Sequence, residues 1–78
     1  MNEKIFKFAD LEIWKRDEHF FARYDVGTHQ IVIREDEISA EDAARAIQSE
    51  EAATRMLFEL QKRLIKLGID PYVSNVED

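Results

Sequence analysis

The sequence contains no cysteine, and this absence excludes disulfide bonds and thiolate metal sites together. It has only two glycines, Gly27 and Gly68, so it has no glycine-rich phosphate loop. No apolar run approaches the roughly 20 residues of a membrane-spanning helix. The N-terminal segment, 1–17, carries charges at short intervals and lacks the apolar centre of a signal peptide. We therefore expect a soluble, cytoplasmic protein.

Proline is also scarce, with one residue, whereas 45% of the residues are apolar. This composition is typical of an ordered globular chain. A length of 78 residues suits one domain, so residues 1–78 are expected to form a single folding unit. A domain of this size buries only about 60% of the surface that its unfolded chain exposes. Because small folds without disulfides or metals often gain stability by oligomerising, we expect a homodimer.

Charge is unevenly distributed along the chain, which has a formal net charge of −6 at pH 7. Residues 1–34 are balanced, and residues 54–67 are net positive. Residues 35–51 hold seven acids against one base, Arg45. These acids, called the acidic belt below, are Glu35, Asp36, Glu37, Glu41, Asp42, Glu50 and Glu51. We expect the belt to steer the protein toward a basic partner, and the acidic surplus to disfavour direct binding of nucleic acid.

Residues 19–36 predict an antiparallel hairpin, because two strand-like runs flank a glycine-centred turn. A two-residue loop at Gly27-Thr28 places glycine at the first central position, as a type II′ turn requires. The strands would span about 19–26 and 29–35. The opposed residues on the first face are Val26 with His29, Tyr24 with Ile31, and Ala22 with Ile33. Those on the second face are Asp25 with Gln30, Arg23 with Val32, and Phe21 with Arg34.

The segment 11–16 alternates apolar and polar residues and predicts a further strand, paired with 19–24 around Asp17-Glu18. The pairs are Leu11 with Tyr24 and Ile13 with Ala22 on the first face, and Glu12 with Arg23 and Trp14 with Phe21 on the second. Both register arguments therefore assign the same two faces. Three interpretations remain for residues 1–9: a strand, a helix or a loose segment. A strand would put Phe6 and Phe8 on the second face.

Downstream of the strands, the spacing of apolar residues becomes that of a helix. Ser39 and Ser49 each precede acidic residues, a pattern typical of helix N-termini. We predict helices over about 40–47 and 50–67, either separate or joined as one kinked helix, with Gly68 as the stop. The apolar stripe of the long helix is Ala53, Leu57, Leu60, Leu64 and Leu67, flanked by Met56. Phe58 and Ile65 lie off this stripe.

Together these elements predict an α+β fold, a three-stranded antiparallel meander with both helices packed on its first face. Residues 69–78 are expected to form a tail or a short edge strand. The second face would carry Trp14, Phe21, Arg23, Val32 and Arg34. Aromatic side chains beside arginine are typical of binding hot spots. We therefore predict these five residues, with Phe58 and Ile65 of the long helix, as partner-binding. The alternative is that the chain's own ends cover the second face.

No catalytic residue, cofactor site or metal site is predicted. His19 could approach Asp36, which gives at most two ligands, fewer than zinc sites use. The acids show no pairing in a cleft that would separate their pKa values. Ser39 and Ser49 are interpreted as helix caps, and neither has a histidine at a fixed spacing.

These observations favour a small acidic protein without enzymatic activity that binds or inhibits a partner protein. A basic nucleic-acid-binding partner fits the acidic belt, by the mimicry that phage and mobile-element inhibitors use. One alternative is a small enzyme or ligand-binding subunit with a site between protomers, built on His19, Arg34 and Asp36. A second is a single-stranded RNA-binding sheet that uses Trp14, Phe21 and Arg23.

Overall fold

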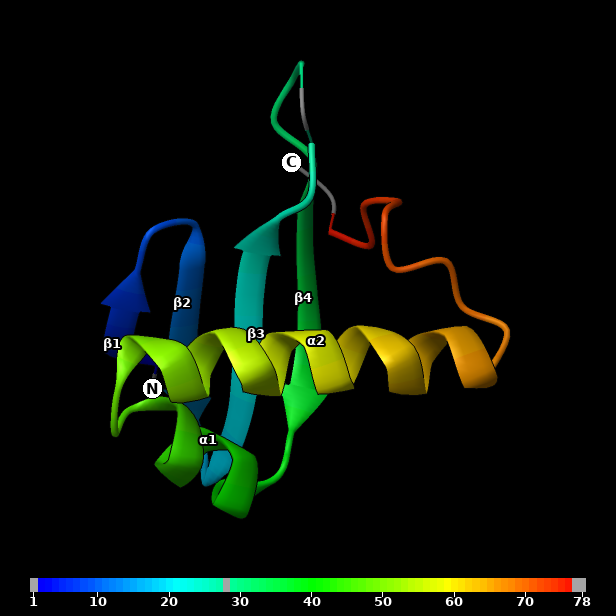
Figure 1. Cartoon of the computed structure of the whole chain (residues 1–78). Helices are drawn as coiled ribbons and strands as arrows, with labels where there is room; N and C mark the ends of the chain where they lie inside the picture. Colours follow the sequence, from blue (N-terminus) through cyan, green and yellow to red (C-terminus); the bar gives the residue numbers. More distant parts are fainter. Residues whose placement is uncertain (1, 28, 77–78) are drawn as a thin grey trace.

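The computed structural model describes residues 2–27 and 29–76, and it shows a four-stranded antiparallel sheet followed by two helices (Figure 1). The strands are β1 (Asn2–Phe8), β2 (Leu11–Arg16), β3 (His19–Asp25) and β4 (Ile33–Ile38), in the order β1-β2-β3-β4. The helices are α1 (Ala40–Ala46) and α2 (Glu50–Lys66). The predicted α+β class and antiparallel sheet are confirmed. The predicted number of strands, three, is wrong, because the N-terminal residues add a fourth.

Strand β1 pairs with β2 after a turn at Ala9, whose φ of 52° lies in the left-handed region. A bulge between Lys4 and Phe6 shifts the register within this pair. As a result Phe6 lies opposite Ile13 and Phe8 opposite Leu11, on the first face. The expectation that a strand here would put Phe6 and Phe8 on the second face is therefore wrong. Phe6 packs against the core instead.

The β2–β3 pairing matches the predicted register pair by pair, including Ile13 with Ala22 and Trp14 with Phe21. The two residues between these strands, Asp17 and Glu18, have φ values of 50° and 70°. Positive φ at both central positions is what a two-residue type I′ turn requires, and this turn suits the twist of a hairpin. The structure therefore confirms the hairpin around Asp17-Glu18.

The β3–β4 pairing differs from the prediction in both register and extent. The fourth strand begins at Ile33 instead of residue 29 and continues to Ile38. Tyr24 lies opposite Arg34, and Ala22 lies opposite Asp36. The first face of β4 therefore presents Arg34, Asp36 and Ile38, where the prediction had Ile31 and Ile33.

A seven-residue connection between β3 and β4 replaces the predicted two-residue loop. The Asp25 carboxylate accepts hydrogen bonds from the backbone N–H groups of Gly27, at 2.8 Å, and Val32, at 2.9 Å. These bonds hold the pKa of Asp25 below its usual value. A Cβ atom on Gly27 would lie 1.7 Å from the carbonyl oxygen of Gln30, so glycine is needed there for a close approach. The other residue of the predicted loop, Thr28, lies outside the described residues.

The two helices are separate, so the alternative of one kinked helix is wrong. Ser39 Oγ accepts from the N–H of Asp42, and Ser49 Oγ accepts from the N–H of Ala52, both at 3.0 Å. Gly68, with φ of 80°, ends α2 as predicted. Its N–H donates to Ile65, and the N–H of Ile69 donates to Leu64, which is a Schellman motif.

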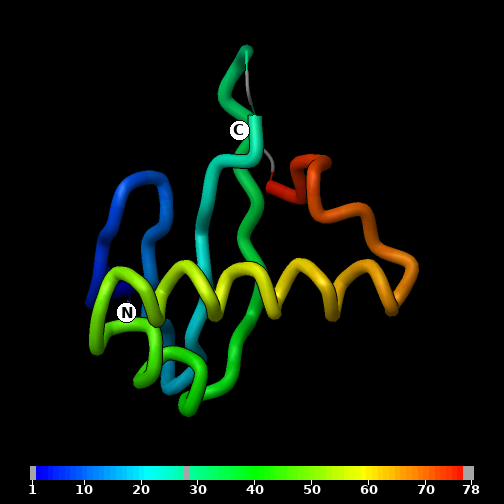
Figure 2. Tube along the Cα trace, in the orientation of Figure 1, coloured from blue at the N-terminus to red at the C-terminus, as the bar shows by residue number. Residues whose placement is uncertain are grey.

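Figure 1 shows α1 and α2 on the same side of the sheet, and Figure 2 shows α2 crossing the strands and extending past β4. The buried apolar residues come from both layers: Leu11, Ile13, Ala22, Tyr24, Ile38, Ala43, Ala46, Ala53, Met56, Leu60 and Leu64. After α2, the described residues 67–76 return to the outer edge of β4, and none of them is assigned to a strand. Ser74 Oγ donates to the Ile33 carbonyl, and the Asn75 amide bonds the backbone N–H and C=O of Glu35. None of the helices among the described residues has the length and apolar character to cross a membrane.

Candidate functional site

The second face of the sheet is the side opposite α1 and α2 (Figure 1). Strand alternation and register place on it Lys4, Glu12, Trp14, Arg16, Phe21, Arg23, Glu35 and Glu37. At its centre Trp14 and Phe21 are direct cross-strand partners. Both rings stay partly exposed and lie outside the buried core cluster. Phe6 and Phe8 do not cover this face, since they lie on the other one.

Each aromatic ring of the second face lies beneath a cation of the same sheet. The Lys4 ammonium lies 5.7 Å from the centroid of the Trp14 ring, and the Arg16 guanidinium lies 4.7 Å from that of Phe21. Cations over aromatic faces at such distances are attracted by the ring quadrupole, by about 0.5–1 kcal/mol when exposed. These long side chains therefore cover part of each ring, and they are themselves 41% and 42% exposed.

Ion pairs and hydrogen bonds connect the polar residues around the aromatic pair. Glu35 accepts from Arg16 at 3.0 Å and from Arg23 at 3.2 Å. Glu12 accepts from the indole N–H of Trp14 at 2.9 Å, and this bond is the main reason that the pKa of Glu12 is lowered. A hollow of about 330 Å³ opens between these groups, lined by Asn2, Trp14, Arg16, Arg23 and Glu35. The second face is thus a charge-paired surface around two aromatic rings.

Three of the five residues predicted for this face, Trp14, Phe21 and Arg23, do lie together on it. Val32 lies in the connection before β4, and Arg34 is on the opposite face with 4% exposure. Sequence reasoning missed Arg16, although alternation from Trp14 along the predicted strand would have found it. It also missed Lys4, whose position depends on the bulge in β1.

Arg34 belongs to a buried polar cluster on the first face. Its guanidinium donates to both carboxylate oxygens of Asp36, at 2.8 and 3.1 Å, and to the carbonyls of Asp70 and Val73, at 3.1 and 2.7 Å. The Tyr24 hydroxyl donates to Asp36 at 2.6 Å. Burial, and next the neighbouring Asp36 carboxylate, raise the pKa of Tyr24 well above its usual value. The cluster is satisfied internally and joins the C-terminal segment to the sheet.

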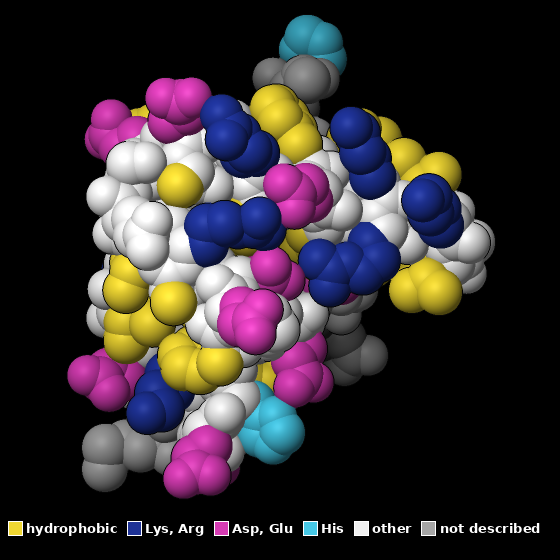
Figure 3. Space-filling model, turned by 60° about the horizontal axis from the view of Figure 1, so that its bottom comes forward, with side chains coloured by type: hydrophobic (Ala, Val, Ile, Leu, Met, Phe, Trp, Pro, Cys, Tyr) yellow, Lys and Arg dark blue, Asp and Glu magenta, His cyan; other side chains and the backbone are white. Residues whose placement is uncertain are grey.

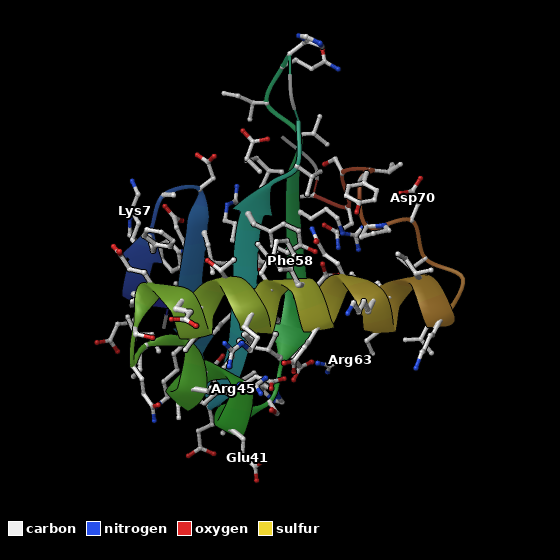
Figure 4. The ribbon with its side chains drawn as sticks, viewed as in Figure 1. Lys7, Glu41, Arg45, Phe58, Arg63 and Asp70 are labelled. Carbon is white, nitrogen blue, oxygen red and sulfur yellow. The ribbon has the colours of Figure 1, made fainter. Side chains whose placement is uncertain are left out.

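The two helix residues predicted as partner-binding, Phe58 and Ile65, are 57% and 55% exposed. Figure 4 places Phe58 on one side of α2 and Arg63 on the other, toward α1. The side of α2 that bears Arg63 contacts α1, because Arg63 donates a hydrogen bond to Asp42 at 3.3 Å. Phe58 and Ile65 are therefore separate from the second face of the sheet, and they form a different exposed surface.

The acidic belt does not form one continuous row. Glu35 lies on the second face and Asp36 on the first, while Glu37 pairs with His19 at 2.8 Å. Asp42 pairs with Arg45 and Arg63, and Glu51 with Arg55. Glu41 and Glu50 are exposed. Figure 3 accordingly shows acidic and basic side chains interspersed over the helices.

Of the three residues suggested for a site between protomers, Arg34 and Asp36 pair at 2.8 Å within the chain, and His19 does not join them. His19 extends from the second face, whereas Arg34 and Asp36 lie on the first. Within residues 2–27 and 29–76, no group of three or more His, Cys, Asp or Glu side chains is arranged to hold a metal ion.

Comparison of the chain with protein-family models, with curated proteins and with solved structures gave no match.

Proposed function

We propose that this protein is a non-enzymatic binding domain that holds a partner protein on the second face of its sheet. The observation that carries the proposal is the cross-strand pair of Trp14 and Phe21 at the centre of that face, with arginines beside it. Large aromatic residues and arginine dominate the free energy of protein association when a partner excludes water from them. A rigid sheet presents them at little cost in conformational entropy.

The polar surroundings of the pair suit a partner surface better than an apolar small molecule. Arg23 and Arg16 are 37% and 42% exposed and already oriented by Glu35. Oriented charged groups around an apolar centre resemble the polar rim of a protein interface. A partner backbone or carboxylate could take hydrogen bonds from the arginines, while its apolar side chains replace Lys4 and Arg16 over the rings.

A basic partner fits the overall charge of −6. The excess acids lie mainly outside the charge-balanced second face, so they would raise the rate of encounter more than they would contribute contacts. A protein that binds nucleic acid is a basic partner of this kind, and occupying it would inhibit it. We propose that it acts in the cytoplasm, because a chain without cysteine needs no oxidising compartment to fold.

The test compares three immobilised proteins in capture from a cell lysate: the wild type, Trp14→Ala/Phe21→Ala and Tyr72→Ala. Tyr72 is a matched control because it is a 60% exposed aromatic residue between Asp70 and Val73, whose carbonyls bond Arg34 of the first face. We expect a stoichiometric partner that the wild type and Tyr72→Ala retain and that the double variant loses. A partner retained equally by all three proteins would overturn the proposed face.

Two further measurements separate the alternatives. Circular dichroism should show that Trp14→Ala/Phe21→Ala is folded, because neither ring belongs to the buried core; an unfolded variant would mean that the face is structural. Trp14 is the only tryptophan, so its fluorescence reports on the second face alone. We expect no change on adding single-stranded RNA at low salt, whereas a saturable change would favour the RNA-binding alternative.

A further inference from the structure

We propose that a second copy of this chain docks on the exposed side of α2, antiparallel to it, with Phe58 on the two-fold axis. The surface is defined by Phe58 and Ile65 of α2, which are 57% and 55% exposed. It is distinct from the second face of the sheet. The inference is independent of the proposed function, because it requires no other protein.

The first observation is the position of Phe58, an exposed aromatic residue at the middle of the 17-residue helix α2. A two-fold interface must be complementary to itself, so each helix residue before the axis meets one at an equal distance beyond it. An antiparallel pair centred on Phe58 would therefore place Phe58 against Phe58, and Ile65 beside Glu51 of the second copy.

The second observation is the charge polarity of the same helix. Its first turn carries Glu50 and Glu51, and its last turns carry Lys62 and Lys66 in addition to Arg63, which bonds α1. Antiparallel docking places the acidic start of each helix beside the basic end of the other, and the helix dipoles also oppose each other. Parallel docking would bring like charges together. Charge complementarity therefore favours a second copy in the antiparallel orientation.

The third observation is that the side of α2 bearing Phe58 is exposed, with more than half of Phe58 and of Ile65 accessible. The opposite side contacts α1 through the pairs Arg45–Glu59, at 2.9 Å, and Arg63–Asp42, at 3.3 Å. Figure 4 shows Phe58 on the side away from these pairs. Because α2 lies over the first face, docking there leaves the second face of each copy pointing outward. The dimer would thus carry two free copies of that face.

The first test is sedimentation equilibrium across a range of concentrations. We expect the wild type and Tyr72→Ala to dimerise and Phe58→Glu to associate at least tenfold more weakly, because it places two carboxylates together on the axis. Circular dichroism would check that Phe58→Glu stays helical, as expected for an exposed position. A monomeric wild type at high concentration, or a Phe58→Glu protein that dimerises normally, would overturn the proposal.

The second test uses charge reversal to distinguish a specific dimer from general apolar association. Glu50→Lys/Glu51→Lys and Lys62→Glu/Lys66→Glu should each be monomeric alone. Mixed together they should form a heterodimer, because each basic turn then meets an acidic one. Dimerisation of each variant alone, or the absence of a heterodimer from two folded variants, would contradict the antiparallel arrangement.

The third test applies if the charge-reversed helices do not fold. Because the natural chain has no cysteine, introduced thiols report on single positions. Glu51 and Ile65 lie seven residues on either side of Phe58, so Glu51→Cys/Ile65→Cys should form a disulfide-linked dimer under mild oxidation. Within one chain these positions are about 21 Å apart along the helix and cannot link. Cross-linking of either single variant would indicate a parallel dimer and reject the proposal.

Discussion

The two faces of this sheet use charged and aromatic residues in different ways. On the first face, Tyr24 and Arg34 are buried beside the core and Asp36 is half-buried, and the three side chains bond one another within the chain. On the second face, Trp14 and Phe21 are partly exposed, and the exposed cations of Lys4 and Arg16 lie over them. The polar groups of the first face therefore bind one another within the chain. The second face instead presents aromatic and charged groups that another protein could bind.

The difference follows from the free energy of burying charge. A buried ion pair whose partner is removed leaves an uncompensated charge, which costs several kcal/mol. An exposed pair remains solvated when its partner is lost, and it contributes about 0.2–1 kcal/mol. Stability should therefore depend strongly on polar residues of the first face and weakly on those of the second.

The largest expected effect compares two arginines. Arg34→Ala leaves Asp36 without its guanidinium and frees two carbonyls of the C-terminal segment, so we expect a loss of about 3–4 kcal/mol in the free energy of unfolding. Arg23→Ala, whose side chain is 37% exposed, should cost less than about 1 kcal/mol. Urea denaturation measures both. Similar losses in the two variants would show that the faces do not differ in this way.

Neighbouring residues on opposite faces give the next comparison. Ile13 has no exposed surface, and Ile13→Ala should destabilise the fold by about 3 kcal/mol through lost burial and a cavity. Trp14 is next in the chain but lies on the second face, so Trp14→Ala should cost only about 1 kcal/mol despite the larger deletion. Thermal unfolding would check the order, and a larger loss from Trp14→Ala would indicate that its own chain covers this ring.

A smaller effect is expected at Tyr24, where Tyr24→Phe removes the hydroxyl that donates to Asp36. The loss should be about 1–2 kcal/mol at neutral pH. Because the folded state holds the pKa of Tyr24 above the usual value of 10.0, its stabilising effect is complete below about pH 10. Above that pH the unfolded chain loses the phenol proton and the folded chain keeps it, so stability falls as pH rises.

Tyr24→Phe should remove this fall in the free energy of unfolding at alkaline pH. Tyr72→Phe changes an exposed residue and should retain the fall. Urea denaturation between pH 8 and 11 would measure the slopes. An unchanged slope in Tyr24→Phe would show that this hydroxyl is not the group responsible.

The smallest effect concerns Glu12, which accepts the indole N–H of Trp14. Its pKa is lowered from 4.5, so the contact should persist as the pH falls below that value and weaken once the carboxylate is protonated. The associated stability is present above pH 4.5 and lost in acid. Trp14 fluorescence should change with a midpoint below 4.5, and Glu12→Gln should abolish this transition. A midpoint at or above 4.5 would argue against the hydrogen bond.

The sequence predicted those parts of the sheet in which apolar residues mark one face. Ile13, Ala22 and Tyr24 identified the first face of β2 and β3, and the register between these strands followed. Both helix starts were predicted because Ser39 and Ser49 have the chemistry that free backbone N–H groups require. The centre of the candidate face, Trp14 and Phe21, was predicted by the same alternation.

The register of β4 could not be predicted, because its first face carries Arg34 and Asp36 where an apolar pattern was expected. These residues can be buried only because they satisfy one another and the C-terminal segment, a long-range relation that local periodicity does not show. The apolar residues Ile31 and Val32 instead belong to the connection that Asp25 holds in place. Likewise, the position of Lys4 over Trp14 could not be predicted, because it depends on a bulge in β1.

The most direct test of the proposed binding face is the affinity of the captured partner for three proteins, measured by isothermal titration calorimetry. Trp14→Ala/Phe21→Ala should bind at least tenfold more weakly than the wild type, a change of about 1.4 kcal/mol or more in binding free energy. Tyr72→Ala should bind within twofold of the wild type. Equal affinities for the wild type and a folded Trp14→Ala/Phe21→Ala variant would contradict the central claim, because the partner would then bind elsewhere.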